Sequence, residues 1–238
     1  MYIRLKPFAV FWRIILALTG TVGLLIKFGV FRGTFQVEQI QYFSVMINII
    51  MIAYFYILSF WQIGNTNDDK TCILPCFKGM ITLSLCLAGL IFHIILNKGV
   101  MPSWSTNVAE NILNYITPLM AVIDWLFFDK KGNFKIYYPF IWCIPAYTYI
   151  MYTYITIFIL RKKVGIELNT LYPYNFLDID KNGFGTTFAL IIVLTIALIF
   201  LGYLFFGIDQ LPNRFSAIKS KFKKKAEPAT ESEGSANE

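Results

Sequence analysis

The chain has 238 residues, of which 57% are hydrophobic and only 15% are charged, and its mean hydropathy is +0.59. Soluble domains are about 45–50% apolar and about 25% charged, because a globule must cover its core with a polar shell. This composition excludes an ordinary soluble domain and favours a protein embedded in a lipid bilayer. The net charge of +7 does not indicate a nucleic-acid partner, because Lys and Arg lie between apolar runs and in the C-terminal segment rather than on one folded face.

Six windows along the chain are long enough and apolar enough to cross a bilayer as α-helices. A spanning helix needs about 20 mostly apolar residues. The windows are residues 8–28, 39–63, 76–97, 105–128, 136–160 and 184–207. Transmembrane β-strands would be about 10 residues long and strictly alternating, and these runs do not alternate. We therefore predict an all-α polytopic membrane protein with a six-helix transmembrane domain over residues 1–211.

The segment over residues 212–238 differs in composition from the rest of the chain. It is polybasic over residues 219–225, and then acidic and rich in small residues. Such a sequence buries too little apolar surface to offset the entropy lost on ordering. We therefore predict a disordered C-terminal tail whose lysines lie against anionic lipid headgroups.

The basic residues of the connectors predict the orientation of the chain, because cytoplasmic loops of membrane proteins are enriched in Lys and Arg. With the N-terminus in the cytoplasm, the inside segments contain more of them than the outside segments do. The inside set is Arg4, Lys6, Lys70, Lys78, Lys130, Lys131, Lys135, Arg214 and the lysines over residues 219–225; the outside set is Lys27, Arg32, Lys98, Arg161, Lys162, Lys163 and Lys181. We expect a cell-membrane protein with both termini in the cytoplasm.

Polar residues inside the apolar windows are the candidate functional positions, because burying such groups in hydrocarbon is costly. In the fourth window they recur at three- and four-residue steps and form one helical stripe. The candidates are Glu110, Asn114, Thr117 and Asp124 in that stripe, with Ser44, Asn48 and His93 in the second and third windows. Helix packing through interhelical hydrogen bonds and a functional polar pocket in the outer half of the bundle are both open alternatives.

The sequence contains no motif for a cofactor or a metal. Nucleotide-binding and zinc-protease signatures do not occur, and the four cysteines lack the spacing of zinc ligands. We therefore predict no cofactor and no metal site.

Several short motifs follow one another in a specific order. ITPLMAVIDWLFF at residues 116–128 precedes a span rich in Pro and Tyr, and LYPYNFLDI at residues 171–179 precedes a glycine-led last span. With YFSVMINII in the second window, they resemble the prokaryotic six-transmembrane protein family, which has a Pro…Asp-Trp helix, a Tyr-Pro-Tyr-x-Phe-x-Asp loop and a Phe-Thr-x-x-x-Asn helix. The resemblance covers most of residues 8–207.

That family looks distantly similar to the androgen-induced membrane proteins, which are intramembrane hydrolases of fatty acid esters of hydroxy fatty acids and use a threonine and a histidine. By position, Ser44 matches the threonine and Asn114 matches the histidine. Ser44 keeps a hydroxyl nucleophile, but an amide cannot accept a proton near neutral pH. In a hydrolase, His93 would therefore be the base and Glu110 would orient it.

These observations predict a multi-pass membrane protein that binds a lipid or small molecule in a polar pocket of the helix bundle. One alternative is an intramembrane serine-type lipid ester hydrolase with Ser44 as nucleophile. A second is a small-solute transporter, although the last three spans do not clearly repeat the first three. Membrane lipids are the expected partners, nucleic acid is not, and a homo-oligomer is left open.

Overall fold

The computed structural model describes residues 6–65, 70–104, 107–164 and 172–226, and the side chains of all of these except residues 160–164 and 213–226. In this part of the chain, six helical segments are long and apolar enough to cross a membrane, and no strand occurs. The prediction of an all-α chain with six apolar spans is confirmed. The chain is a multi-pass membrane protein.

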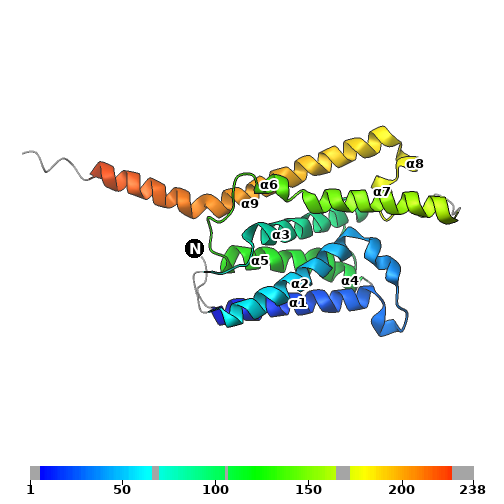
Figure 1. Ribbon diagram of the computed structural model, residues 1–238, viewed down its shortest axis with the longest axis horizontal. Helices are drawn as coiled ribbons and strands as arrows, with labels where there is room; N and C mark the ends of the chain where they lie inside the picture. Colours follow the sequence, from blue (N-terminus) through cyan, green and yellow to red (C-terminus); the bar gives the residue numbers. More distant parts are fainter. Residues whose placement is uncertain (1–5, 66–69, 105–106, 165–171, 227–238) are drawn as a thin grey trace, which may run out of the picture.

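The six spans are built from helices that are continuous in some cases and interrupted in others (Figure 1). The first two are α1 (Lys6–Lys27) and α2 (Phe43–Gly64), joined by the 3-10 turns η1 (Val30–Arg32) and η2 (Val37–Gln41). The third is α3 (Pro75–Leu90) with the π-helix η3 (Ile91–Leu96), and the fourth is α4 (Val108–Asn111), the π-helix η4 (Ile112–Ile116) and α5 (Thr117–Phe128). The fifth is α6 (Tyr138–Ile141) with α7 (Ile144–Val164), and the last is α9 (Phe184–Ala226), preceded by η6 (Asn175–Leu177) and α8 (Ile179–Asn182).

Successive spans run in opposite directions, so the bundle has two ends (Figure 1). We name them after the first and last residues of α1: the Lys6 end and the Lys27 end. The Lys6 end also holds the C-terminus of α5 and the N-terminus of α3, whereas the N-termini of α2 and α4 lie at the Lys27 end. Side chains from different spans can therefore meet at each end.

The last helix is longer than the sequence composition predicts. It continues to Ala226, through the polybasic segment that we expected to be disordered, with Pro212 inside it. Extending a formed helix avoids the cost of nucleation, and Lys and Ala are good helix formers. Residues 227–238, the acidic part of the predicted tail, lie outside the described residues.

The helices form a central group and a peripheral pair. Helices α1, α2, α3 and α5 pack against one another, whereas α7 and α9 run along one side and are the least buried spans (Figure 1). An aromatic cluster attaches α9 near the Lys6 end. In it, the Trp125 ring stacks on Phe205 with centroids 4.5 Å apart, and Phe134 lies 4.9 Å from Trp142. Towards the Lys27 end, a cavity separates α7 and α9 from the central helices.

Candidate functional site

The cavity has a volume of about 230 Å³ and lies between α2, α3, α7, α9 and the segment over residues 174–177. Most of its wall is apolar, and the aliphatic side chains that form it include Leu87, Ile91, Ile150, Leu177, Leu194 and Leu198. Because these side chains come from five separate elements, the cavity depends on the tertiary arrangement and on no single helix. Its apolar wall can hold a hydrocarbon chain out of contact with water.

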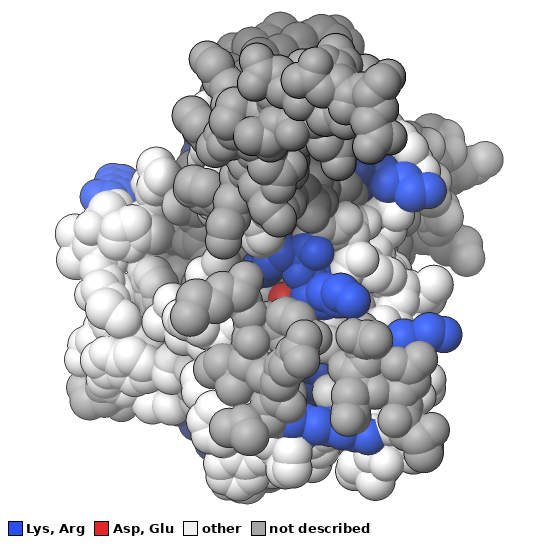
Figure 2. Space-filling model, turned by 90° about the vertical axis from the view of Figure 1, so that its left-hand side faces the viewer, with Lys and Arg blue, Asp and Glu red and all other residues white. Residues whose placement is uncertain are grey.

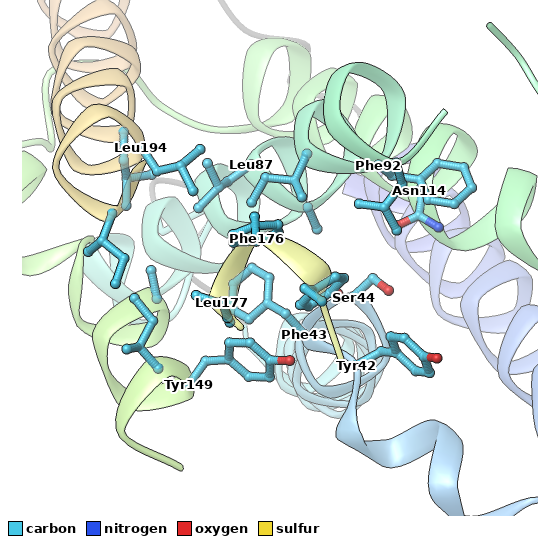
Figure 3. Close-up of a pocket in the computed structure, with 18 of the residues that line it drawn as sticks. Tyr42, Phe43, Ser44, Leu87, Phe92, Asn114, Tyr149, Phe176, Leu177 and Leu194 are labelled. Atoms are coloured by element: carbon cyan, nitrogen blue, oxygen red, sulfur yellow. The ribbon is translucent and has the colours of Figure 1, made fainter. Parts of the chain in front are cut away.

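One side of the cavity is polar. Ser44 and Asn114 extend their polar atoms into the same side, and Leu194 borders the opposite side (Figure 3). Lys27 and Glu110 also line the cavity, at the Lys27 end. Three of the predicted site residues, Ser44, Glu110 and Asn114, therefore line one cavity, which joins a small polar region to a larger apolar one.

An ion pair neutralises the charges in the polar region. The Lys27 ammonium donates to one carboxylate oxygen of Glu110, and the Asn114 amide nitrogen donates to the other at 3.1 Å. The same amide nitrogen also donates to the backbone carbonyl of Glu110 at 3.0 Å. Both carboxylate oxygens are thus hydrogen-bonded, and the two formal charges cancel.

The Asn114 side chain has an unsatisfied acceptor. Asn114 is only 2% exposed, and its Oδ1 atom has no hydrogen-bond partner in the described part of the chain. Since both hydrogen bonds of the amide nitrogen go to oxygen atoms, the assignment of nitrogen and oxygen in this amide is fixed by its surroundings. A buried acceptor without a donor costs free energy, so Oδ1 is a place where a ligand can gain a hydrogen bond.

The backbone around Asn114 is also unusual. Asn114 lies in the π-helix η4, and the π-helix η3 ends the neighbouring span. A Cβ atom at Gly89 of α3 would lie 2.5 Å from the Asn114 carbonyl oxygen, so glycine is needed for the two helices to approach this closely. Short π-helical segments occur frequently at functional sites, because they alter the direction of side chains within a helix.

Ser44 lies in the first turn of α2, where helix N–H groups lack intrahelical partners. The Tyr174 ring lies beside this turn and meets the Tyr42 ring edge to face, with the two centroids 5.8 Å apart. Burial raises the pKa of Tyr174 to about 12. The phenol therefore stays neutral near pH 7. Tyr174 also lines the cavity, and our sequence analysis did not select it.

Asn48 of α2 and Thr117 of α5 connect these two helices outside the cavity. The Thr117 hydroxyl donates to Asn48 Oδ1 at 2.8 Å, and Asn48 Nδ2 donates to the backbone carbonyls of Ser44 and Leu113 at 2.7 and 3.1 Å. Both side chains are fully buried and neither lines the cavity. They therefore hold the N-terminal part of α2 against η4 and position Ser44 indirectly.

His93 contacts Tyr115 rather than Ser44. Its Nδ1 atom lies 3.0 Å from the Tyr115 hydroxyl in a hydrogen bond, and the two rings meet edge to face. His93 does not line the cavity that contains Ser44. The structure therefore brings Ser44 and Asn114 together and places the histidine outside their cavity.

Asp124 belongs to a buried charge cluster near the Lys6 end. It pairs with Arg13 at 2.9 Å and with Lys78, and Asp129 pairs with the same two cations at 2.9 and 2.6 Å. Arg13 also donates to the Gln62 side chain and to the Thr71 carbonyl. The cluster contains two cations and two carboxylates, so it is neutral overall, and it ties α1 and α3 to α5.

The sequence analysis did not predict this cluster, although the sequence contains charged residues that indicate it. Arg13, Lys78 and Asp124 are charges of opposite sign inside apolar windows. In alternating spans, the start of the first and third windows and the end of the fourth lie at the same end of the bundle. Opposite charges at that end are therefore candidates for a buried ion pair.

The described residues offer no evident metal site, since no three His, Cys, Asp or Glu side chains among them could hold one ion. Comparison of the chain with protein-family models, with characterised proteins and with solved structures gave no match.

Proposed function

We propose that the protein binds a single-chain amphiphilic lipid in the cavity at the Lys27 end. One observation supports this most directly: a single cavity combines a small polar region, formed by Ser44, Glu110 and Asn114, with a larger aliphatic wall. An amphiphile has the same division. Its chain would lie between α3, α7 and α9, and its headgroup would lie beside Asn114.

The size of the cavity favours a small ligand. Ligand pockets commonly enclose about 300–1,000 Å³, and this cavity encloses about 230 Å³. Two acyl chains and a phosphate headgroup need more space than that. One chain with a compact headgroup comes closest to the volume. The part of a long chain that the cavity cannot enclose would extend into the bilayer between α7 and α9, the two least buried spans.

Filling the apolar part of the cavity tests this proposal. In Leu194→Trp, the indole would occupy space that the lipid chain needs, so lipid retained by the purified full-length protein should fall when measured by native mass spectrometry. Val193→Trp is the matched control, because Val193 is 60% exposed and adjacent on α9. Equal lipid retention in the two folded variants would contradict the proposal.

A second candidate function is the hydrolysis of a lipid ester, in a relative of the prokaryotic six-transmembrane family. The observation that favours it is that Ser44 and Asn114, which match the catalytic pair of the androgen-induced hydrolases by position, line the same cavity. The Ser44 oxygen would attack the ester carbonyl, the alcohol would leave with a proton, and water would release the acid.

Covalent labelling tests this candidate. A hydrolytic Ser44 should react with an alkyl fluorophosphonate in the reconstituted protein, and Ser44→Ala should abolish the adduct in mass spectrometry. If wild-type protein that retains lipid shows no adduct, the hydrolase candidate fails and lipid binding stands.

We also infer that the Lys6 end faces the cytoplasm of the cell. Lysine and arginine side chains lie beside a recessed carboxylate at that end (Figure 2). Anionic cytoplasmic surfaces attract such residues. A fluorescent protein fused to the C-terminus should fluoresce and an alkaline phosphatase fusion should be inactive; an active phosphatase would reverse the orientation.

A further inference from the structure

The polar region of the cavity has a specific hydrogen-bonding requirement. Its buried acceptor, Asn114 Oδ1, has no donor among the described residues, whereas the Asn114 amide nitrogen is already bonded to Glu110. The unmet requirement is therefore for a donor, and a ligand that carries an O–H or N–H group can meet it.

The charge of the polar region argues against an acidic ligand. Apart from tyrosines, Lys27 and Glu110 are the ionisable residues that line the cavity, and they are paired with each other. A carboxylate or phosphate headgroup would find no unpaired cation there and would be repelled by Glu110. A cationic headgroup would compete with Lys27 for the same carboxylate. A neutral headgroup avoids both costs.

We propose that the ligand of this cavity is a neutral, single-chain lipid with a hydroxyl headgroup that donates a hydrogen bond to Asn114 Oδ1. This inference rests on the proposed function and adds the chemical class of the ligand. Two sources share this chemistry: a monoacylglycerol and a long-chain alcohol. Asn114 is then the residue that selects for the hydroxyl, and the aliphatic wall accepts the chain.

A comparison of four ligands with the same chain tests the inference. The full-length protein is placed in nanodiscs of neutral phospholipid, and the displacement of a fluorescent fatty-acyl probe is measured for 1-monooleoylglycerol, oleyl alcohol, methyl oleate and oleate. The two hydroxyl ligands should bind about three- to tenfold more tightly than methyl oleate, which lacks a donor, because one hydrogen bond is worth about that factor. Oleate should also bind more weakly than they do.

The relative affinities of the two hydroxyl ligands identify the source. Tighter binding of monooleoylglycerol indicates a glycerol headgroup, and tighter binding of oleyl alcohol indicates that a single hydroxyl suffices. Either order supports the inference. Equal or tighter binding of methyl oleate or oleate overturns it, while the proposed function survives. If none of the four displaces the probe, the proposed function fails as well.

Variants separate the headgroup contact from the chain contact. Asn114→Leu removes the acceptor at similar volume, so the preference for monooleoylglycerol over methyl oleate should disappear. Leu194→Trp should weaken both ligands to the same extent and leave their ratio unchanged. A preference that persists in folded Asn114→Leu would overturn the role of Asn114, and the wild-type ratio remains decisive if that variant fails to fold.

Discussion

The Arg13 guanidinium and the Asp124 carboxylate, which lie 111 residues apart in sequence, form a 2.9 Å ion pair, and both side chains are completely buried. Lys78 and Asp129 close this pair into a ring of alternating charges. Removing two charges from water is expensive, and the loss is offset here because every carboxylate oxygen of the ring has a cationic partner. The cluster therefore fixes the relative positions of α1, α3 and α5 near the Lys6 end.

Breaking this ring at one residue should destabilise the protein strongly. Arg13→Met leaves Asp124 and Asp129 facing only Lys78, so we expect a loss of about 3–5 kcal/mol in the free energy of unfolding. Thermal unfolding followed by fluorescence-detected size-exclusion chromatography in detergent measures the shift. Lys135→Met is the control, because Lys135 is exposed and should change the midpoint little.

Removing both members of the pair should restore much of that loss. Arg13→Met combined with Asp124→Leu leaves Lys78 and Asp129 as a neutral pair at 2.6 Å. We expect the double variant to unfold at a higher temperature than either single variant. Additive losses would show that the ring is not a coupled unit.

Because α3 and η4 approach closely at Gly89, adding one methyl group there should destabilise the protein. Gly89→Ala places a Cβ atom 2.5 Å from the Asn114 carbonyl oxygen, so the helices must separate at a cost of about 1–3 kcal/mol. Gly207→Ala is the matched control, because nothing lies within 4 Å of a Cβ atom there. That control should be neutral or stabilising, since alanine is the better helix former. A neutral Gly89→Ala variant would mean that the helices are farther apart than described.

The Lys131 side chain predicts a dependence of stability on pH. Its ammonium lies 3.7 Å from the centre of the Trp125 ring, and burial lowers the pKa of Lys131 to about 8, more than Asp129 and Asp209 raise it. Between about pH 8 and the ordinary value of about 10.5, the unfolded chain holds more protons than the folded protein. Stability should therefore rise with pH across this range.

Replacing Lys131 should remove this contribution. The unfolding midpoint of Lys131→Met should rise less between pH 8 and 10 than that of wild type, and Lys135→Met should behave like wild type. The difference between the two variants isolates Lys131 from tyrosines that titrate in the same range. Parallel profiles for all three proteins would refute the assignment.

Because Ser44 and Asn114 line the same cavity, a histidine at position 114 should increase the reactivity of Ser44. Asn114→His places an imidazole in the cavity that contains Ser44, where an amide cannot accept a proton. We expect the fluorophosphonate adduct at Ser44 to form faster in this variant than in wild type, with Ser44→Ala/Asn114→His as the unreactive control. An unchanged rate in the folded variant would indicate that Ser44 and residue 114 do not face each other closely enough for catalysis.

The apolar windows predicted the six spans because hydrocarbon thickness imposes a minimum length on them. The start of the second span was less predictable: residues 39–42 are apolar or uncharged, yet they form part of η2 and the cap of α2. The helical stripe correctly brought Glu110 and Asn114 to one face. Tyr174 could not be found in this way, because it reaches the cavity from a connector that folds back on the bundle.

The placement of His93 shows a further limit of periodicity. Counting 100° per residue from Thr82 through Gly89 puts His93 on their face, but the helix becomes π-helical at Ile91. A π-helical turn contains an additional residue, so side chains after that point rotate out of the expected register. Helical periodicity also cannot predict that Asp124 pairs with Arg13, because the two residues lie on different helices.

The most direct test of the central claim, that the cavity at the Lys27 end holds a lipid chain, is photo-crosslinking with a monoacylglycerol that carries a diazirine in its acyl chain. In nanodiscs, peptide mapping should place crosslinks on Ile150, Leu194 and Leu198, which line the cavity, and Leu194→Trp should remove them. Crosslinks confined to exposed residues of the same helices, such as Phe158 and Ile196, and unaffected by Leu194→Trp, would contradict the account.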